Sequence, residues 1–472
     1  MMKRNNLLTC GVWSSRIPLR SHPGYDADSI ATSDNRRICL SNMRRFALLA
    51  GIVLVMTNAT KVWADNVVTR WAEQALNAVR VGNISTPAAA RLYAMTTVSM
   101  YDAVNGIDRG RHRSKREYAL VPPDKAPIAG NRRAAVAAAA HAVLIAILPS
   151  HASVLNGALA EELATLGGEG APPVALGRDW GHFVGEQVVA LRANDGTQVA
   201  ETPPPGTGPG EFRLPFTGAQ FRHMTTFGVE SIHPYASLGP PPLTSTEYTE
   251  DFNEVKVLGS ITDPDLERAA IARHWQAEAN TARETGLWFK AALSIVEDQG
   301  TVHSLSRTAR LFALIGMGIA DSIAASWTAK FDYNFWRPGD AIRNASTDGN
   351  PATDEDPTWT PRNMSFGGTP EHTSGSSTFA GAAATILTGL YCHEDVAFAF
   401  EGELGTPPRS YTGFAEAAEE AGRSRIYNGI HFDFSHQRGW EAGKGIGAEI
   451  VNTRLRRRAR SCHGLPCVCP QL

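Results

Sequence analysis

Three short segments in the second half of the chain contain the side chains that a protein uses to hold an oxyanion. They are residues 330–338 (KFDYNFWRP), 370–376 (PEHTSGS) and 424–431 (SRIYNGIH). Lysine binds an anion as a point charge and arginine as a planar fork. A serine-glycine turn at a helix start adds a hydroxyl and free backbone N–H groups. Such a combination indicates an enzyme that acts on, or with, a tetrahedral or five-coordinate oxyanion.

The first segment carries two cations, Lys330 and Arg337, seven residues apart. Seven residues bring a helix round to within about 20° of its starting direction, so both side chains would share one face if the helix continued. Pro338 disfavours helical geometry at the residue before it, which puts Arg337 near the helix end. Taken alone, this pair also fits a solvated basic face.

The second and third segments add a turn and a histidine. Ser374 and Gly375 precede an apolar run, and the start of that helix would offer free N–H groups to an anion. Arg425 and His431 flank Gly429, which we expect to end a helix. A histidine on such a turn can be a nucleophile, a metal ligand or a satisfied polar residue.

Together and in this order, the three segments resemble one superfamily, which contains the vanadium-dependent haloperoxidases and the type 2 phosphatidic acid phosphatases. The wider sequence is similar to the bacterial haloperoxidase-like branch, with further similar stretches at residues 88–105, 252–256 and 271–275. The similarity spans most of the chain after residue 65. The three segments are specific to the superfamily, and the flanking stretches are suggestive.

The resemblance implies a role for each matching residue. Vanadate is the expected cofactor, and phosphate could occupy the same site. Three cations would neutralise its equatorial oxygens, and the serine hydroxyl and glycine amide would hydrogen-bond to them. His431 would ligate vanadium as the metal ligand, or attack a phosphate ester and form a phosphohistidine. The implied cofactor-binding residues are Lys330, Arg337, Ser374, Gly375 and Arg425.

Two positions depart from the superfamily pattern. Ser376 stands where a histidine usually follows the serine-glycine pair as acid or base, and its hydroxyl does not titrate near neutral pH. We hypothesise that His372 supplies a proton from another direction. The acid that orients the last histidine is also unsettled, because Ser435 lies four residues after His431 and Asp433 two residues after it. Phe335, Trp336 and His372 are expected to line the site and to influence halide choice.

Three functions remain open on these residues. The first is a vanadium-dependent haloperoxidase that uses hydrogen peroxide, a halide and a small organic acceptor. The second is a soluble acid phosphatase acting on a phosphate ester with His431 as nucleophile. The third is a catalytically weak oxyanion-binding protein, which Ser376 makes plausible. A formal net charge of -2 over 472 residues gives no reason to expect nucleic acid as a partner.

The N-terminal region has the pattern of an export signal. A short basic stretch, an apolar run from Phe46 to Met56 and a small residue before Asp65 predict a signal peptide over residues 43–64. Residues 1–42 are then an upstream extension, and the protein is expected to be periplasmic or secreted. No other stretch reads as a membrane span. Three cysteines in the tail, residues 456–472, could form bridges in an oxidising compartment.

The remaining sequence predicts an all-α fold, a large helical bundle of two stacked halves. The N-terminal half covers residues 65–245 and includes an irregular Pro/Gly-rich segment at 202–242. The C-terminal half covers residues 246–455 and carries the oxyanion site, and large apolar helices leave room for a homodimer. Apolar periodicity and capping residues predict helices at 66–81, 85–104, 131–148, 173–193, near 245, near 263, 305–331, 375–390, 411–428 and 439–454.

Overall fold

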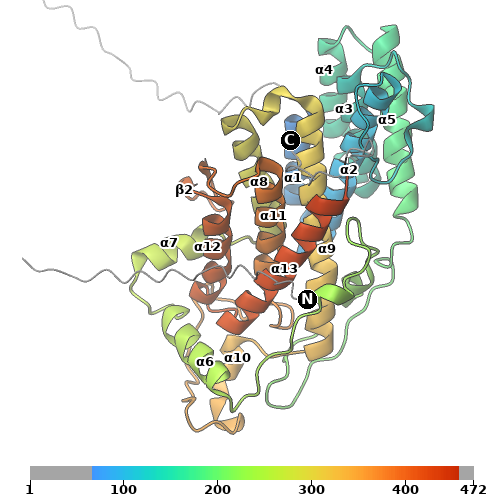
Figure 1. The fold of residues 1–472 in the computed structure, drawn as a ribbon. Helices are drawn as coiled ribbons and strands as arrows, with labels where there is room; N and C mark the ends of the chain where they lie inside the picture. The colour runs from blue at the N-terminus through green and yellow to red at the C-terminus, as the bar shows by residue number, and fades with distance from the viewer. Residues whose placement is uncertain (1–65, 457–472) are drawn as a thin grey trace, which may run out of the picture. The chain divides into compact units, whose positions relative to one another are not determined.

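A computed structural model describes residues 66–456 of the chain (Figure 1). Its regular structure is almost entirely helical, so the all-α fold class is confirmed. The first helices are α1 (Val67–Gly82), α2 (Thr86–Gly110), α3 (Arg132–Ile147), α4 (Ala152–Thr165) and α5 (Pro172–Leu191). After the irregular segment come α6 (Thr246–Leu258), α7 (Leu266–His274), α8 (Arg283–Asp298), α9 (Leu305–Tyr333) and α10 (Pro338–Arg343). The last are α11 (Gly375–Tyr391), α12 (Phe414–Tyr427) and α13 (Asp433–Thr453).

The sequence explains where many of these helices begin. Side chains at the N-cap positions accept hydrogen bonds from backbone amides that have no partner within the helix. Asn66, Asn131, Ser245 and Asp265 do so at α1, α3, α6 and α7. The sequence did not reveal α4, α8 or the short antiparallel pair β1 (Phe398–Phe400) and β2 (Arg409–Tyr411).

Helix α9 is the central helix of the fold. Among the described residues it is the one helix long and apolar enough to cross a membrane, contrary to the expectation that no further stretch would be. However, 94% of its apolar window is buried inside the protein, as in the core helix of a globular domain. It packs against α2, α11 and α13 (Figure 1). Its C-terminal end supplies Lys330, so the core positions one of the predicted site residues directly.

Two helix pairs pack through glycine seams of the same design. In the first pair, α5 presents a glycine every fourth residue to the backbone of α3. A Cβ atom on Gly177 or Gly181 would lie 2.2 Å from an α3 carbonyl oxygen, and one on Gly185 would lie 2.6 Å away. Real Cβ contacts do not reach such distances, so only glycine permits this approach.

The second seam joins α13 to α11, which lie side by side in Figure 1. A Cβ atom on Gly439, Gly443 or Gly447 would lie 2.7, 2.1 and 2.6 Å from the carbonyl oxygens of residues 374, 378 and 382. The seam therefore begins at Ser374 itself. It fixes the amino end of α11, where the anion site was predicted, against the helix that follows His431.

Two buried aspartates hold loops against the core. Asp102 on α2 accepts hydrogen bonds from three consecutive amides at residues 119–121. Asp321 on α9 does the same for residues 227–229, within the irregular segment. Burial raises the pKa of each carboxyl to about 6, although the amide hydrogen bonds oppose the shift. These bonds explain how a Pro/Gly-rich segment stays packed on the helices.

The predicted domain boundaries remain predictions. One large apolar core includes residues from both predicted halves, and a smaller apolar cluster lies in the C-terminal half. The predicted upstream extension, signal peptide and cysteine-containing tail lie outside the described residues, apart from residue 456.

Candidate oxyanion site

The three predicted segments converge on one cavity of about 760 Å³. The ends of four helices meet there: the C-terminal ends of α9 and α12 and the N-terminal ends of α10 and α11. Most of the predicted site residues line it: Lys330, Arg337, Gly375, Ser376, Arg425 and His431. Segments separated by up to about a hundred residues in sequence therefore form a single chemical environment.

Lys330 and Arg337 reach the cavity by a route that differs from the prediction. Helix α9 ends at Tyr333, and Asn334 adopts a left-handed conformation that turns the chain out of the helix. Arg337 is then the N-cap of α10, with Pro338 at the first helical position. The two cations meet because two helix ends lie together, so the expectation of one shared helical face was wrong.

All three cations are buried. Lys330 is 2% exposed, Arg337 4% and Arg425 7%. Burial lowers the pKa of Arg337 to about 10 and lowers the pKa of Lys330 well below its usual range, where the charge of Arg337 acts in the same direction. The pKa of Arg425 is also lowered by burial. Each cation therefore pays a desolvation cost that an anionic ligand would relieve.

The hydrogen bonds of these cations go mainly to backbone carbonyls. Lys330 Nζ donates to the carbonyl of Glu371 at 3.1 Å, and Arg337 Nε donates to the carbonyl of Thr369 at 2.7 Å. Arg425 Nη1 donates to the carbonyl of Trp275 at 3.2 Å, and its Nε has no partner among the described residues.

Two carboxylates lie beside the three buried cations, and Glu278 and Arg283 add one charge of each sign at the cavity wall. Glu371 is fully buried, and Glu284 lies 3.7 Å from Arg425 Nη2 at the cavity wall. Because carbonyl dipoles do not cancel a net charge, the cavity has an excess of positive charge in a low-dielectric setting. This charge balance and the donor set fit a vanadate or phosphate anion.

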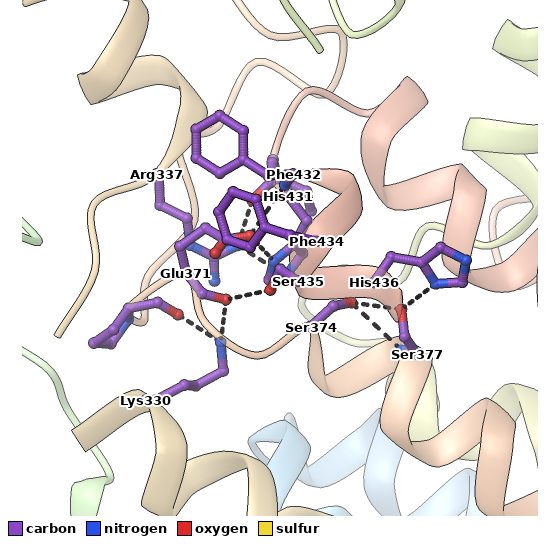
Figure 2. A network of polar contacts seen from close by, with 12 residues as sticks. Lys330, Arg337, Glu371, Ser374, Ser377, His431, Phe432, Phe434, Ser435 and His436 are labelled. Carbon is purple, nitrogen blue, oxygen red and sulfur yellow. Dashed lines mark hydrogen bonds and ion pairs between the residues drawn. The ribbon is translucent and has the colours of Figure 1, made fainter. Parts of the chain in front are cut away.

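His431 is held with one ring nitrogen directed to an acid and the other to the cations. Its Nδ1 lies 2.9 Å from Glu371 Oε1, and its Nε2 lies 3.0 Å from Arg337 Nη1 (Figure 2). Burial and the nearby cations lower the pKa of His431 well below its usual value, so the ring is neutral. We infer that Nδ1 carries the proton and that Nε2 accepts the Arg337 N–H, a contact that a ligand at Nε2 would replace.

Glu371 answers the open question of the orienting acid. Its Oε1 also accepts a hydrogen bond from the Phe432 amide at 3.0 Å. Burial raises the pKa of Glu371 to about 7, against the lowering effect of Arg337 and Lys330. Asp433 instead pairs with Arg423 at 2.7 Å. Sequence reasoning missed Glu371, although an acid between proline and histidine in an otherwise small, polar turn was a visible signal.

Ser435 has a smaller part in this arrangement. Its Oγ donates to the backbone carbonyl of Glu371 at 3.4 Å, and the Ser374 amide donates to the Ser435 carbonyl at 3.3 Å. These contacts fasten the turn after His431 to the turn before α11.

The amino end of α11 faces the cavity through Gly375 and Ser376. Ser374, predicted to bind the anion, does not line the cavity: it is fully buried at the N-cap, where its Oγ accepts the Ser377 amide at 3.4 Å. A Cβ atom on Gly375 would lie 3.1 Å from Phe379 and 3.5 Å from Trp327, both of which line the cavity. Glycine therefore keeps the helix start open to a ligand.

His372 points away from the cavity, contrary to our hypothesis. It is not among the lining residues, and its Nε2 is 2.7 Å from the carbonyl of Leu238 and 2.9 Å from Ser237 Oγ. Burial lowers the pKa of His372 to about 3. Its position does not support direct proton transfer in the cavity.

The expected aromatic lining was also wrong. Phe335 and Trp336 belong to a separate apolar cluster, and the aromatic residues of the cavity wall are Trp327, Phe379 and Phe221. Arg337 lines the cavity, whereas the two residues before it pack into the separate apolar cluster. The spacing of these residues in the sequence did not reveal this difference.

Comparison with known proteins shows what this fold is similar to. Residues 310–459 match the family model described as "VCPO second helical-bundle domain". No curated protein matches the chain. Among solved structures, "the first bacterial vanadium dependant iodoperoxidase" is similar with a TM-score of 0.67 and 21% identity, over 82% of this chain and 95% of that one. The "holo-type bacterial Vanadium-dependent chloroperoxidase" gives 0.61 and 14%, over 78% and 92%.

These similarities confirm the superfamily resemblance that the three segments predicted. The matched segment 310–459 contains every predicted site residue. The chain therefore has the haloperoxidase-like helical fold, and residues 310–459 are similar to the second helical-bundle domain of that family model.

Proposed function

We propose that the chain is a vanadium-dependent haloperoxidase that binds vanadate in this cavity and uses hydrogen peroxide to oxidise a halide. One observation carries the proposal: three buried cations converge beside a neutral histidine whose Nε2 faces them and accepts a hydrogen bond from Arg337 Nη1 that a ligand would replace. Lys330, Arg337 and Arg425 would hold the anion's charge, the start of α11 would donate hydrogen bonds, and His431 would ligate vanadium. Vanadate, when bound, supplies a Lewis acid that activates peroxide toward a halide.

The protein's own residues supply orientation and electrostatics. Glu371 keeps the His431 ring in the tautomer that presents Nε2, and Arg337 holds the same nitrogen from the cavity side. The wall formed by Trp327, Phe379 and the packed ends of four helices limits water around the cations. Fixed charges in such an environment act more strongly than in solution, since little reorganisation is needed.

A soluble acid phosphatase is the second candidate, and the state of His431 favours it too. A neutral imidazole with an oriented lone pair is what attack on phosphorus requires. His431 Nε2 would form the N–P bond while the ester P–O bond breaks. In a phosphatase, Ser376 would leave the departing alcohol without the histidine that usually donates a proton to it. We therefore rank the phosphatase function second. A weak oxyanion-binding protein is the third candidate.

Two assays distinguish these functions. The protein is incubated with vanadate, hydrogen peroxide and bromide or iodide, and halogenation of a phenolic dye is followed. A vanadate-free sample is tested for hydrolysis of p-nitrophenyl phosphate. The haloperoxidase proposal expects turnover in the first assay that His431→Ala removes. Hydrolysis alone would reverse the order, and inactivity in both would leave oxyanion binding as the function.

We further propose that the protein is exported to the periplasm or secreted. The proposal rests on the signal-peptide pattern at residues 43–64. N-terminal sequencing of the protein recovered from its native host tests it: a mature start at or near residue 65 is expected, and an intact leader in the cytoplasm would contradict it.

A further inference from the structure

A basic segment follows α2 and lies at the end of that helix remote from the oxyanion site. Residues 109–116 (RGRHRSKR) contain four arginines, one lysine and one histidine. The other end of α2 contributes Thr86 and Pro87 to the wall of the oxyanion cavity. A helix of 25 residues is about 37 Å long, so the basic segment lies far from that cavity.

Polar contacts with α2 and within the segment hold it in a defined conformation. Arg109 Nη1 donates to the carbonyl of Arg116 at 2.6 Å, which closes the segment on itself. Ser114 Oγ donates to Asn105 Oδ1 on α2 at 2.7 Å. The segment therefore forms a built part of the protein surface rather than a loosely attached loop.

Two neighbouring stretches of chain extend the segment into a larger surface. Arg111 Nε donates to the carbonyl of Ile128 at 2.7 Å, which joins the segment to the loop before α3. Arg116 Nη1 donates to the carbonyl of Leu455 at 3.3 Å, which joins it to the chain after α13, where Arg456 is exposed. We define the basic surface as residues 109–118, Ile128 and Arg456.

The charge of the basic surface is not balanced by nearby acids. Arg113 and Lys115 are exposed, and their side chains make no hydrogen bond or ion pair with any residue that the structure describes. Glu117 is the one carboxylate in the basic surface. Because the whole chain has a formal net charge of -2, this excess of cations is a local feature. Such a field attracts a surface of the opposite sign.

A buried arginine adds to this field from below. Arg310 of α9 is fully buried, and its Nε donates to the same Leu455 carbonyl at 3.2 Å. Its Nη1 and Nη2 have no hydrogen-bond partner among the described residues. Burial and the charges of Arg116 and Arg456 lower the pKa of Arg310 to about 9, so it is still charged at neutral pH.

Two large apolar side chains stand among the cations. Ile128 is 63% exposed and Tyr118 is 39% exposed. The boundary layer of a lipid bilayer accommodates both, because an aliphatic chain reaches the acyl region while a tyrosine keeps its hydroxyl among the headgroups. A nucleic acid or a soluble polyanion would pair with the cations but would offer Ile128 no apolar environment. The composition of the basic surface therefore favours a membrane.

We propose that the basic surface docks the protein on an anionic lipid bilayer, with its cations on the headgroup phosphates and Ile128 and Tyr118 in the boundary layer. Each basic residue near such a membrane strengthens binding about 5-fold, so several together hold a protein that one would not. Docking at this end of α2 does not cover the oxyanion cavity at the other end. The proposal uses no residue of that cavity and is independent of the proposed activity.

Vesicle sedimentation tests the proposal with the full chain. The wild-type protein is expected to bind vesicles that contain phosphatidylglycerol, not vesicles of phosphatidylcholine alone, and to bind less tightly as ionic strength rises. Replacing Arg113 and Lys115 together by Gln should weaken binding about 25-fold. Replacing Lys256 and Lys444 by Gln, on α6 and α13, changes the net charge equally elsewhere and should alter binding less than about 2-fold.

A third variant separates a membrane from a soluble polyanion. Ile128→Ser should weaken binding to the anionic vesicles about 5-fold, since the apolar contact is lost, and should leave binding to dextran sulfate unchanged. Equal binding to neutral and anionic vesicles, or an Arg113/Lys115 variant that binds like the Lys256/Lys444 control, would overturn the proposal. An Ile128→Ser protein that binds vesicles like the wild type would also overturn it, in favour of a soluble polyanion.

Discussion

The amino ends of α3 and α11 are built alike and surrounded differently. Each helix packs through its backbone carbonyls on a glycine seam, α3 against α5 and α11 against α13. Each begins at a polar N-cap, Asn131 or Ser374. Each also borders a cavity, of about 720 Å³ with three arginines in its wall at α3, and of about 760 Å³ with three arginines and one lysine in its wall at α11.

The cations differ in their partners. At α3, Arg132 lies 2.9 Å from Asp108 and Arg133 lies 3.2 Å from Glu162, and both arginines are about a third exposed. At α11 the cations are buried and bonded mainly to carbonyls. The glycine seam and the N-cap occur at both helix starts and are therefore structural features. What distinguishes the site at α11 is that its cations are buried and outnumber the carboxylates near them.

The largest expected effect separates the two cavities. Replacing Arg337 by Gln should weaken phosphate or vanadate binding on the order of 100-fold, because a charge-assisted bond in a buried site is lost. Arg132→Gln at α3 should change the phosphate or vanadate affinity less than 2-fold, because Arg132 is already paired with Asp108. Titration calorimetry of both variants checks this. Equal losses would mean that charge burial does not distinguish the cavities.

The orienting acid gives the next effect. Glu371→Gln should lower kcat about 10- to 100-fold, as loss of an outer partner of a ligating histidine does. Asp433→Asn, a control at the acid that sequence reasoning considered, should leave kcat unchanged. Steady-state kinetics of the two variants decide between the acids, and the reverse pattern would return the role to Asp433.

The seams themselves should respond alike in stability and differently in binding. Alanine at Gly181 or Gly443 would bring a methyl group to 2.2 or 2.1 Å from a carbonyl oxygen. Each change should cost about 1–3 kcal/mol of unfolding free energy, the usual range for overpacking. Only Gly443→Ala should also weaken phosphate binding, since it displaces α11. Urea unfolding measures the stability of each variant, and calorimetry measures its phosphate affinity. Unchanged phosphate affinity in Gly443→Ala would mean that the packing of α11 on α13 does not control the site.

The smallest effect concerns pH. Burial lowers the pKa of His372 to about 3 in the folded protein, from 6.5. Below pH 6.5 the unfolded chain takes up a proton that the folded protein does not, so this contribution to stability is lost as pH falls toward 3. Between pH 7 and pH 5 it should amount to about 2 kcal/mol.

Urea unfolding of the wild-type protein and of His372→Gln at pH 7 and pH 5 checks this contribution. His141→Gln, in α3, serves as the comparison, because burial also lowers the pKa of His141. The wild-type protein should lose about 2 kcal/mol more than His372→Gln on acidification. An identical pH dependence would mean that His372 is protonated when folded.

The sequence predicted the fold class from local signals, and the resemblance of the three segments to one superfamily predicted that the site residues converge. Apolar periodicity and N-cap residues such as Asn131 are readable over a few positions. The three segments contain every predicted site residue, and six of these line the cavity. Helix α8 was missed: its start at Arg283 lacks an N-cap side-chain bond, although its buried apolar residues, such as Leu287, Ala291 and Ile295, recur at helical spacing.

Pairings across long stretches of sequence were not readable. Glu371 and His431 lie sixty residues apart, and nothing local indicates that one orients the other. The direction of His372 depends on the position of Leu238, which belongs to an irregular segment. Likewise, Lys330 and Arg337 meet because Asn334 turns the chain out of α9 and Arg337 begins α10, and the spacing of the two residues did not reveal this turn.

Calorimetric titration of the wild-type protein with orthovanadate, followed by a crystal structure of the complex, tests the central claim most directly. We expect one vanadate per chain in the cavity between Lys330, Arg337 and Arg425, with vanadium bonded to His431 Nε2. Absence of binding, or an anion seated at the paired arginines of α3 instead, would contradict the account.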